Sequence, residues 1–255
     1  MPVRRNAGAE PVRRNAGAQS VRRYGRALVT LAAVAALGVS AAACSSTDSG
    51  GTGAGAALAA KPAADAELFA DLPAKLAADG TTVVVGKADA PHTVKVYLDP
   101  QCPFCAKFET GGGEGLAKAI RDGKAKAEYT VASFLDQGAD GPSTHAANAL
   151  RAALGEGKFA EYHAALYASQ PEEGSPDAYN TDHLLKIADQ VKGLRSAAFD
   201  KAVRDMTYKD WVKKSEQAFE ASGERGTPAV LIDGKKIDTR EGLFTADGFT
   251  KALGS

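Results

Sequence analysis

Cysteine is scarce in this sequence. Only three of its 255 residues are cysteines: Cys44, Cys102 and Cys105. A structural zinc ion takes about four cysteine or histidine ligands, and the later two cysteines have no second CxxC pair to complete such a set. His92 could add a ligand only if the fold happened to bring it near. The shortage argues against zinc, and we expect neither a metal ion nor an organic cofactor.

A basic excess is missing from most of the chain, although the formal net charge is zero. Seven arginines lie within the first 26 residues, where Glu10 is the only acidic residue. The sequence from Cys44 onward is therefore mildly acidic. Proteins that bind nucleic acid present a basic surface, so we expect no nucleic-acid partner.

A long apolar run is missing as well. The run at residues 27–43 is rich in alanine and shorter than the about 20 residues of a membrane-spanning helix. Arginines precede it and small residues end it, which is the pattern of an export signal, so we interpret residues 1–43 as a signal peptide. Its basic leader is duplicated, with PVRRNAGA at Pro2–Ala9 and again at Pro11–Ala18. Two such short polar copies cannot bury a core, and one hypothesis is that translation starts later, near Val21.

Cys44 is the cysteine without a partner. It ends the segment Ala41-Ala42-Ala43-Cys44, which resembles the site where a bacterial lipoprotein is cleaved and its new N-terminal cysteine is lipidated. Ala41 departs from that pattern, because Leu, Val or Ile is usual there, and an ordinary Ala-x-Ala cleavage is the alternative. We favour lipidation of Cys44. Residues 44–63 are mostly Ser, Gly, Thr and Ala, a composition typical of a flexible tether.

The other two cysteines form Cys102-Pro103-Phe104-Cys105, between the strand-like run Thr93–Leu98 and a helical pattern. The first turn of a helix has unpaired N–H groups and the positive end of the helix dipole, which stabilise a thiolate. Pro103 suits the first helical position. We expect Cys102, at an exposed tip, to be the attacking thiolate and Cys105, more buried, to be the resolving thiol. A purely structural disulfide is the alternative.

The remaining patterns predict an α/β domain over residues 64–255. We expect a helix at Ala64–Ala78, a β-α-β unit containing the cysteines, a helical insertion at about 137–223, and a C-terminal half made of a β-hairpin and a helix. Within this plan, the predicted strands are Thr81–Val85, Thr93–Leu98, Ala127–Leu135, Ala229–Ile232 and Lys235–Asp238, and the closing helix is Thr245–Leu253. This is a thioredoxin-like fold split by an inserted helical domain.

These patterns, with further local matches, make the chain resemble the DsbA-like branch of the thioredoxin superfamily, the thiol:disulfide oxidoreductases of the bacterial envelope. The matching stretches are Val83–Gly86, Tyr97–Cys105, Phe108-Glu109, Ala146–Ala149, Leu166-Tyr167, Gln170-Pro171, Trp211-Val212 and Gly226–Val230. The resemblance implies that Pro228 is cis and lies against the cysteine pair. It also implies that the Thr227 backbone offers an edge for an extended substrate peptide.

The chain departs from this family at two positions. Many relatives have a buried glutamate six residues before the first cysteine, where this chain has Val96. Asp99 is the candidate to replace it as a proton relay, and a solvated turn residue is the alternative reading. Strongly oxidising members have a histidine between the cysteines, where this chain has Phe104. The reduction potential is therefore expected anywhere between about −120 and −270 mV.

We expect an extracytoplasmic oxidase that donates the Cys102–Cys105 disulfide to exported proteins with reduced cysteines and is reoxidised by a membrane partner. It would be a monomer, held by the lipid on Cys44 at the outer face of the cytoplasmic membrane, or secreted if that lipid is absent. A reductase or isomerase, or a non-catalytic peptide-binding module, are the alternatives. A Cys–His hydrolase would need a histidine held against Cys102. His145 and His163 lie on helical patterns, and we expect His145 to be a surface or partly buried helix residue instead.

Overall fold

The structure is a computed structural model that describes residues 58–172, 174, 175 and 177–254. The predicted leader, Cys44 and most of the tether lie outside these residues. The first described residues already pack against a helix, because the N–H and the carbonyl of Lys61 both bond the Ser169 hydroxyl, at 2.8 and 3.0 Å. Packing thus begins a few residues before the expected boundary at Ala64.

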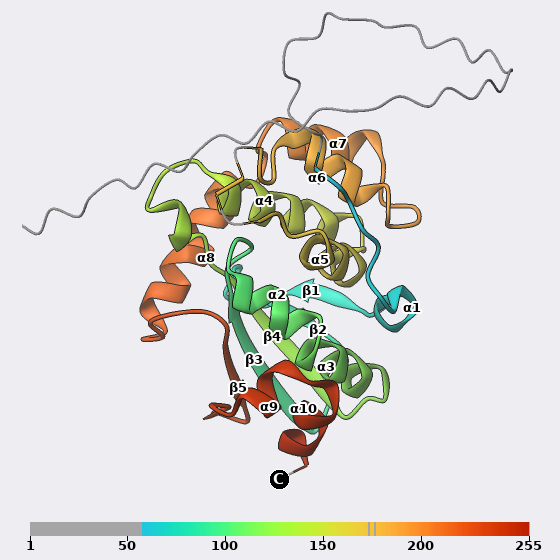
Figure 1. Cartoon of the computed structure of the whole chain (residues 1–255), viewed down its shortest axis with the longest axis vertical. Coiled ribbons are helices and arrows are strands. Elements are labelled where there is room, and N and C mark those ends of the chain that lie inside the picture. The colour runs from blue at the N-terminus through green and yellow to red at the C-terminus, as the bar shows by residue number, and fades with distance from the viewer. Residues whose placement is uncertain (1–57, 173, 176, 255) are drawn as a thin grey trace, which may run out of the picture. The chain divides into compact units, whose positions relative to one another are not determined.

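A six-stranded mixed sheet lies at the centre, in the order β1-β2-β4-β3-β5-β6 (Figure 1). β3 and β4 are parallel, and every other neighbouring pair is antiparallel. The strands are β1 (Ala74–Leu76), β2 (Val83–Val85), β3 (His92–Leu98), β4 (Ala125–Val131), β5 (Ala229–Ile232) and β6 (Lys235–Lys236).

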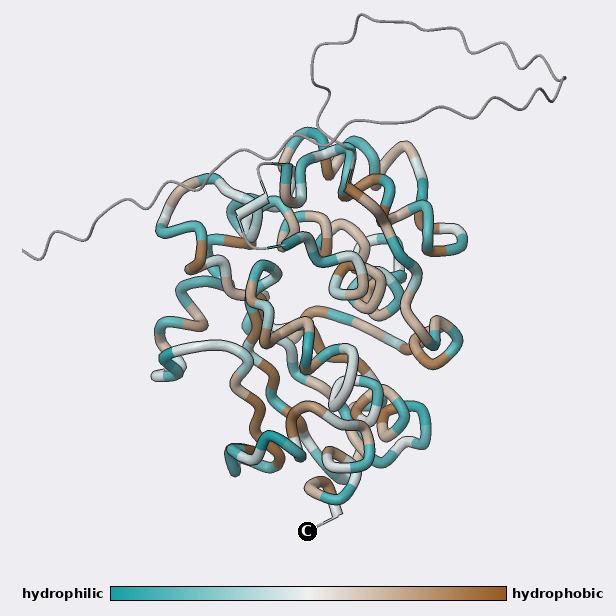
Figure 2. The backbone as a smooth tube through the Cα atoms, viewed as in Figure 1, coloured by the Kyte–Doolittle hydropathy of each residue, from teal (hydrophilic) through white to brown (hydrophobic). Residues whose placement is uncertain are grey.

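The central strands β3 and β4 bury one apolar face, whereas their other face also carries polar residues such as Lys95 and Glu128. Val94, Val96 and Leu98 of β3 are completely buried on one face. On the other face, Tyr97 contacts Phe219 of α8 (Lys209–Ala221), with ring centroids 6.2 Å apart. Figure 2 shows this apolar character along the middle of the sheet.

The connection from β3 to β4 runs through α2 (Pro103–Glu109) and α3 (Gly112–Arg121). Thr110 and Gly111 separate the two helices. The C-terminal helices α9 (Arg240–Phe244) and α10 (Ala246–Leu253) pack against α3. β3, α2, α3 and β4 form the predicted β-α-β half of the fold, and α9 and α10 belong to its C-terminal half.

Between β4 and β5 the chain forms the predicted helical insertion (Figure 1). Its helices pack mainly on one another: α4 contacts α5, α7 and α8, and α5 contacts α6. They are α4 (Pro142–Gly155), α5 (Phe159–Ala168), α6 (Thr181–Ala188), α7 (Ala197–Arg204) and α8. The split thioredoxin-like architecture is therefore confirmed.

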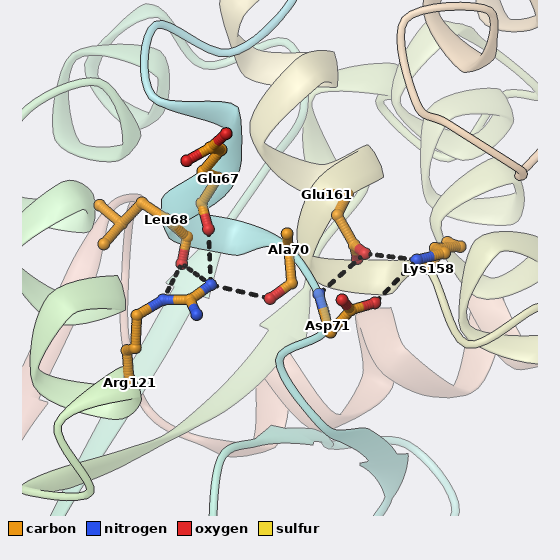
Figure 3. Close-up of polar contacts among 7 residues, drawn as sticks. All are labelled: Glu67, Leu68, Ala70, Asp71, Arg121, Lys158 and Glu161. Carbon is orange, nitrogen blue, oxygen red and sulfur yellow. Dashed lines mark hydrogen bonds and ion pairs between the residues drawn. The ribbon is translucent and has the colours of Figure 1, made fainter.

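The predicted helix at Ala64–Ala78 is wrong. The segment forms only one helical turn, α1 (Ala66–Phe69), and then β1. Pro73 cannot donate a helical hydrogen bond. The Arg121 guanidinium of α3 donates to the carbonyl groups of residues 67, 68 and 70, and Lys158, the N-cap residue of α5, donates to Asp71 (Figure 3). These contacts from Arg121 and Lys158 hold the segment between α3 and the start of α5, without a continuous helix.

The strand predicted at Ala127–Leu135 has other bounds in the structure, and one helix was not predicted. β4 starts at Ala125 and ends at Val131, because its pairing with β3 runs from His92 to Leu98. A 3₁₀ turn, η1 (Phe134–Asp136), follows. The helix α9 was not expected, since its five residues carry too short a pattern to detect.

Candidate redox-active site

The β3 strand delivers the cysteine motif to the start of α2 as predicted. Cys102 is the N-cap residue of α2 and Pro103 occupies its first turn. The N–H groups of Cys105 and Ala106 donate to the Cys102 carbonyl, at 3.0 and 3.2 Å. The Cys102 sulfur therefore lies at the end of the helix where unpaired N–H groups concentrate.

Both cysteines are free thiols and both are buried, with Cys102 7% exposed and Cys105 completely enclosed. The expectation that Cys102 lies at an exposed tip is wrong. Two distant segments cover it. Its Sγ donates to the Thr227 carbonyl at 3.2 Å, and Nε2 of Gln170, which follows α5, donates to its carbonyl at 3.0 Å. The expectation that Cys105 is the more buried of the two is confirmed.

The surroundings separate the two thiols electrostatically. A hydrogen bond from Cys105 is the largest cause that lowers the pKa of Cys102 to about 6, and it outweighs burial; the Thr227 side chain and the N–H groups of Cys105 and Phe104 add to it. Burial, followed by the charge of Cys102, raises the pKa of Cys105 well above its usual value. Cys102 is therefore mostly thiolate at neutral pH, and Cys105 is a thiol.

Thr227 and Pro228 lie beside this pair, where the resemblance places them. The peptide bond between them is cis. Besides the carbonyl that accepts from Cys102, Thr227 has a buried hydroxyl with no other partner in the described part of the chain. This hydroxyl acts on both sulfurs and lowers the pKa of each. The segment entering β5 thus completes the site from the C-terminal half of the domain.

Asp99 is completely buried, so its reading as a solvated turn residue is wrong. Its carboxyl accepts from the N–H of Gln101 at 2.9 Å, the N–H of Leu135 at 3.2 Å and the hydroxyl of Ser143 at 2.5 Å. Burial raises its pKa to about 7, and these hydrogen bonds only partly oppose that effect. The Asp99 main chain also acts on the Cys105 sulfur.

A second buried carboxyl, missed in the sequence, ties this loop to the helical domain. Asp136 accepts from the N–H groups of Ser143 and Thr144 at the start of α4, at 3.0 and 2.7 Å, and from Nε2 of Gln101 at 2.8 Å. An acidic residue a few positions before a helix, as Asp136 stands before Pro142, is the signal that could have revealed it.

Phe104 provides the apolar surface of the site. It is 61% exposed, and its ring lies 6.4 Å from that of Phe244 in α9. The ammonium group of Lys107 lies 4.8 Å from the centroid of the Phe244 ring. An apolar patch with one cation therefore borders Cys102.

The histidines do not approach Cys102. His145 is about one-third exposed and pairs with Asp140 at 3.4 Å, as expected of a partly buried helix residue. His163 is buried, with Nε2 3.1 Å from Oε2 of the equally buried Glu109. No cysteine–histidine pair for hydrolysis is formed by the described residues.

The described residues contain neither a metal-binding cluster nor a membrane-spanning helix. No group of three or more histidine, cysteine, aspartate or glutamate residues is arranged to hold a metal ion within that part. Nor is any helix there both long and apolar enough to cross a bilayer. What the site can do chemically follows from its two thiols: attack on a disulfide by a stabilised thiolate, and release by a neighbouring thiol.

Comparisons with known proteins agree with this geometry. A family model described as thioredoxin matches residues 78–253. The thiol:disulfide interchange protein DsbL of Lelliottia amnigena is 22% identical over 180 residues, covering 65% of this chain and 78% of its own length. The serine/threonine-protein kinase PknE of Mycobacterium tuberculosis is 28% identical over 116 residues, 43% of this chain. The chain spans only 20% of the length of that kinase.

Among solved structures, the MdbA protein of Actinomyces oris, a thiol-disulfide oxidoreductase, has a similar fold, with a TM-score of 0.61 and 24% identity. The match covers 72% of this chain and 90% of that one. BdbD of Bacillus subtilis matches with a TM-score of 0.59 and 21% identity, over 72% and 96% of the two chains. At such identities the likeness establishes the fold.

Proposed function

Because this chain belongs to the thioredoxin family, we propose that it is a thiol:disulfide oxidoreductase that donates the Cys102–Cys105 disulfide to exported proteins. The observation that carries the proposal is the opposite shift of two adjacent thiols, one with its pKa lowered to about 6 and the other with its pKa raised. A purely structural cysteine pair has no need for such a difference.

In the proposed reaction a client thiolate attacks Cys102 of the disulfide. The bond between Cys102 and Cys105 breaks, its electron pair passes to Cys105, and Cys105 takes up a proton. A second client thiolate then attacks the client sulfur of the mixed disulfide. Cys102 leaves with the electron pair as a stabilised thiolate, the client gains a disulfide, and the chain is left as a dithiol.

Thr227 and Pro228 border the sulfur that the client attacks. We propose that the Thr227 backbone holds an extended client peptide beside Cys102, since Thr227 lies at the entry to β5 and its carbonyl is 3.2 Å from Cys102 Sγ. The apolar ring of Phe104 would contact the same peptide. Asp99 is proposed as a proton relay, supported by its burial and its pKa of about 7.

The rest of the proposal concerns place and partners. The leader pattern supports export, and the segment ending at Cys44 supports attachment by lipid to the outer face of the cytoplasmic membrane. Disulfides persist in that oxidising environment. The reduced pair would be reoxidised by a membrane partner, and the chain would act as a monomer.

A reductase or isomerase of the same fold is the second candidate, and one observation favours it. The pKa of Cys102, about 6, lies nearer to the about 7 of the thioredoxin cysteine than to the about 3.5 of DsbA. A less stabilised thiolate means a more reducing pair. Phe104, which cannot donate a hydrogen bond to the sulfur, is consistent with this.

Thiol trapping of the protein in its own cells, with the reduction potential of the purified domain, distinguishes the candidates. A resting disulfide and a potential toward −120 mV are expected for the oxidase. A resting dithiol with a potential near about −270 mV would instead support the reductase. If Cys102→Ser left the folding of exported proteins unchanged, neither redox role would stand and a peptide-binding module would be favoured.

A further inference from the structure

Behind the cysteine pair, two helices bring Cys105 together with three ionisable side chains that the reaction above does not use. On α2, Cys105 and Glu109 are four residues apart and share one face of the helix. On α5, which packs against α2, His163 and Tyr167 are four residues apart in the same way. All four are buried, none being more than 4% exposed. We refer to Cys105, Glu109, His163 and Tyr167 as the buried cluster.

The far end of the cluster is an acid–base pair in an apolar enclosure. Nε2 of His163 lies 3.1 Å from Oε2 of Glu109, and both side chains are 3% exposed. The His163 ring is surrounded by the rings of Tyr129, Phe159 and Tyr167, with centroids 4.8 to 5.3 Å away. A carboxylate without a partner in such a place is costly, and His163 is the basic group beside it.

Nothing else in the described part of the chain engages this pair. Oε1 of Glu109 and both ring nitrogens of His163 have no hydrogen-bond partner there, so the approach of Nε2 to Oε2 is an ion-pair contact. Gly113 of α3 makes room for the carboxyl, since a Cβ at that position would stand 2.8 Å from Oε2 of Glu109. A buried polar group left without a partner is destabilising, so the arrangement calls for an explanation other than stability.

Tyr167 connects the pair to the sulfur. Its hydroxyl is buried and has no hydrogen-bond partner among the residues described. Burial first, and then the charges of Cys105 and Glu109, raise its pKa well above the usual value. The hydroxyl therefore lies within the electrostatic reach of both ends of the cluster and stays protonated itself. Such a group can pass a proton on but cannot keep a negative charge.

The buried cluster lies near Val96, the strand position at which many DsbA-like proteins have a glutamate. Val96 pairs with Tyr129 of β4, and Tyr129 contacts His163. The pair thus lies next to the strand position that has lost its carboxyl. A buried acid is supplied from the active-site helix instead of from the strand.

We propose that Tyr167 relays the proton of Cys105 to and from the Glu109–His163 pair. When Cys105 attacks a mixed disulfide on Cys102, its proton passes to the Tyr167 oxygen as the Tyr167 proton passes to the pair. The new bond joins the two cysteine sulfurs, and the other sulfur leaves with the electron pair as a thiolate. When a client opens the disulfide, the proton returns to Cys105 along the same path.

Other titratable groups face the cluster and enter its pH dependence. They are Cys102, Asp99 from the β3–α2 connection, Tyr129 from β4 and Tyr179 before α6. Burial raises the pKa of both tyrosines well above the usual value, so they remain neutral. Cys102 and Asp99, with pKa values of about 6 and about 7, titrate near neutral pH. Asp99→Asn is therefore a necessary arm of the test.

The inference rests on the proposed function and is tested on its resolving step. The oxidised protein is converted with glutathione to the mixed disulfide on Cys102, and the release of glutathione by Cys105 is timed across a range of pH. In the wild type the rate should reach a plateau as the pH rises. In Tyr167→Phe it should be at least about tenfold slower near pH 7 and keep rising with pH, because only solvent removes the proton.

Tyr162→Phe is the matched control on the same helix. Tyr162 is equally buried, but its hydroxyl donates to the Leu184 carbonyl at 3.0 Å. Its loss should lower stability and leave the resolving rate unchanged. Tyr167→Phe should do the reverse, because its hydroxyl has no hydrogen-bond partner to lose. Glu109→Gln should slow the step as Tyr167→Phe does, and the double variant should be no slower than either, since the groups act in one path.

The outcomes separate the two claims. A Tyr167→Phe protein that resolves at the wild-type rate at every pH would overturn the relay. So would a slowing confined to Asp99→Asn, because the proton would then leave through Asp99. A wild-type protein that never releases glutathione from Cys102 would instead overturn the proposed function itself.

Discussion

Replacing Thr227 by valine tests how the site stabilises its thiolate. Valine keeps the size of the side chain and removes the hydroxyl, which is buried and has no partner other than the sulfurs in the part described. Together with the larger contribution of Cys105, that hydroxyl lowers the pKa of Cys102. The main-chain carbonyl that accepts from Cys102 is retained. The substitution therefore removes one donor and little else.

The size of the effect follows from the energy of one hydrogen bond to a charged group, about 1.5–3 kcal/mol. One pKa unit corresponds to about 1.4 kcal/mol, so the pKa of Cys102 should rise from about 6 to between about 7 and 8. At pH 7 the thiolate fraction should fall from about nine-tenths to about half or less. Since the reduced form loses stability, the reduction potential at pH 7 should fall by about 20–30 mV.

The assay is a pH titration of the ultraviolet thiolate absorbance of the reduced protein, with the potential measured against glutathione. Thr110→Val is the control. Its hydroxyl donates to the Ala106 carbonyl at 2.8 Å at the other end of α2, so it perturbs the same helix without touching a sulfur. An unchanged titration midpoint in Thr227→Val would refute the role given to the hydroxyl.

Three further predictions concern stability and potential. Asp99 has a folded-state pKa of about 7, above the value of about 3.9 in an unfolded chain. Its contribution to the free energy of unfolding is therefore fully present below pH 4 and is lost as the pH rises to about 7. Urea unfolding at several pH values should show this loss of stability in the wild type and not in Asp99→Asn. Phe104→His adds a hydrogen-bond donor near the Cys102 thiolate and should raise the potential by about 30 mV, measured against glutathione. Asn148→Ala leaves the Ala202 carbonyl and the Tyr208 N–H, bonded at 3.1 and 2.8 Å, without partners, and should cost about 2–4 kcal/mol in urea unfolding. The first prediction is contradicted if the stability of Asp99→Asn varies with pH as that of the wild type does. The second is contradicted by an unchanged potential in Phe104→His, and the third by an unchanged free energy of unfolding in Asn148→Ala.

The cysteine motif was predictable because its chemistry is local. A strand, a proline at the first helical position and two cysteines one turn apart are all within one short stretch of sequence. That stretch fixes where the Cys102 sulfur stands relative to the helix end. Thr227 and Pro228, more than 100 residues later, could be assigned to the site only through the family resemblance.

The environment of the motif was not predictable, because it is assembled from distant segments. The burial of Asp99 depends on Leu135 and Ser143, which lie 36 and 44 residues further along the chain. The burial of Cys102 depends on Thr227 and Gln170. No local pattern indicates that these segments meet.

The burial of His163 was missed for a different reason. Its helix, Phe159–Ala168, is apolar on nearly every side, so hydrophobic periodicity does not say which face meets α2. The helix predicted at Ala64–Ala78 failed because leucines at helical spacing outweighed Pro73, a residue that breaks helices. In both cases the tertiary partners decided the outcome.

Site-specific alkylation of the reduced protein across a range of pH, read by mass spectrometry, tests the central claim most directly. It reports Cys102 and Cys105 separately. Cys102 should become reactive with a midpoint near pH 6, and Cys105 should stay unreactive until far higher pH. Two cysteines that titrate together near the value of a free thiol, about 8.5, would contradict the account.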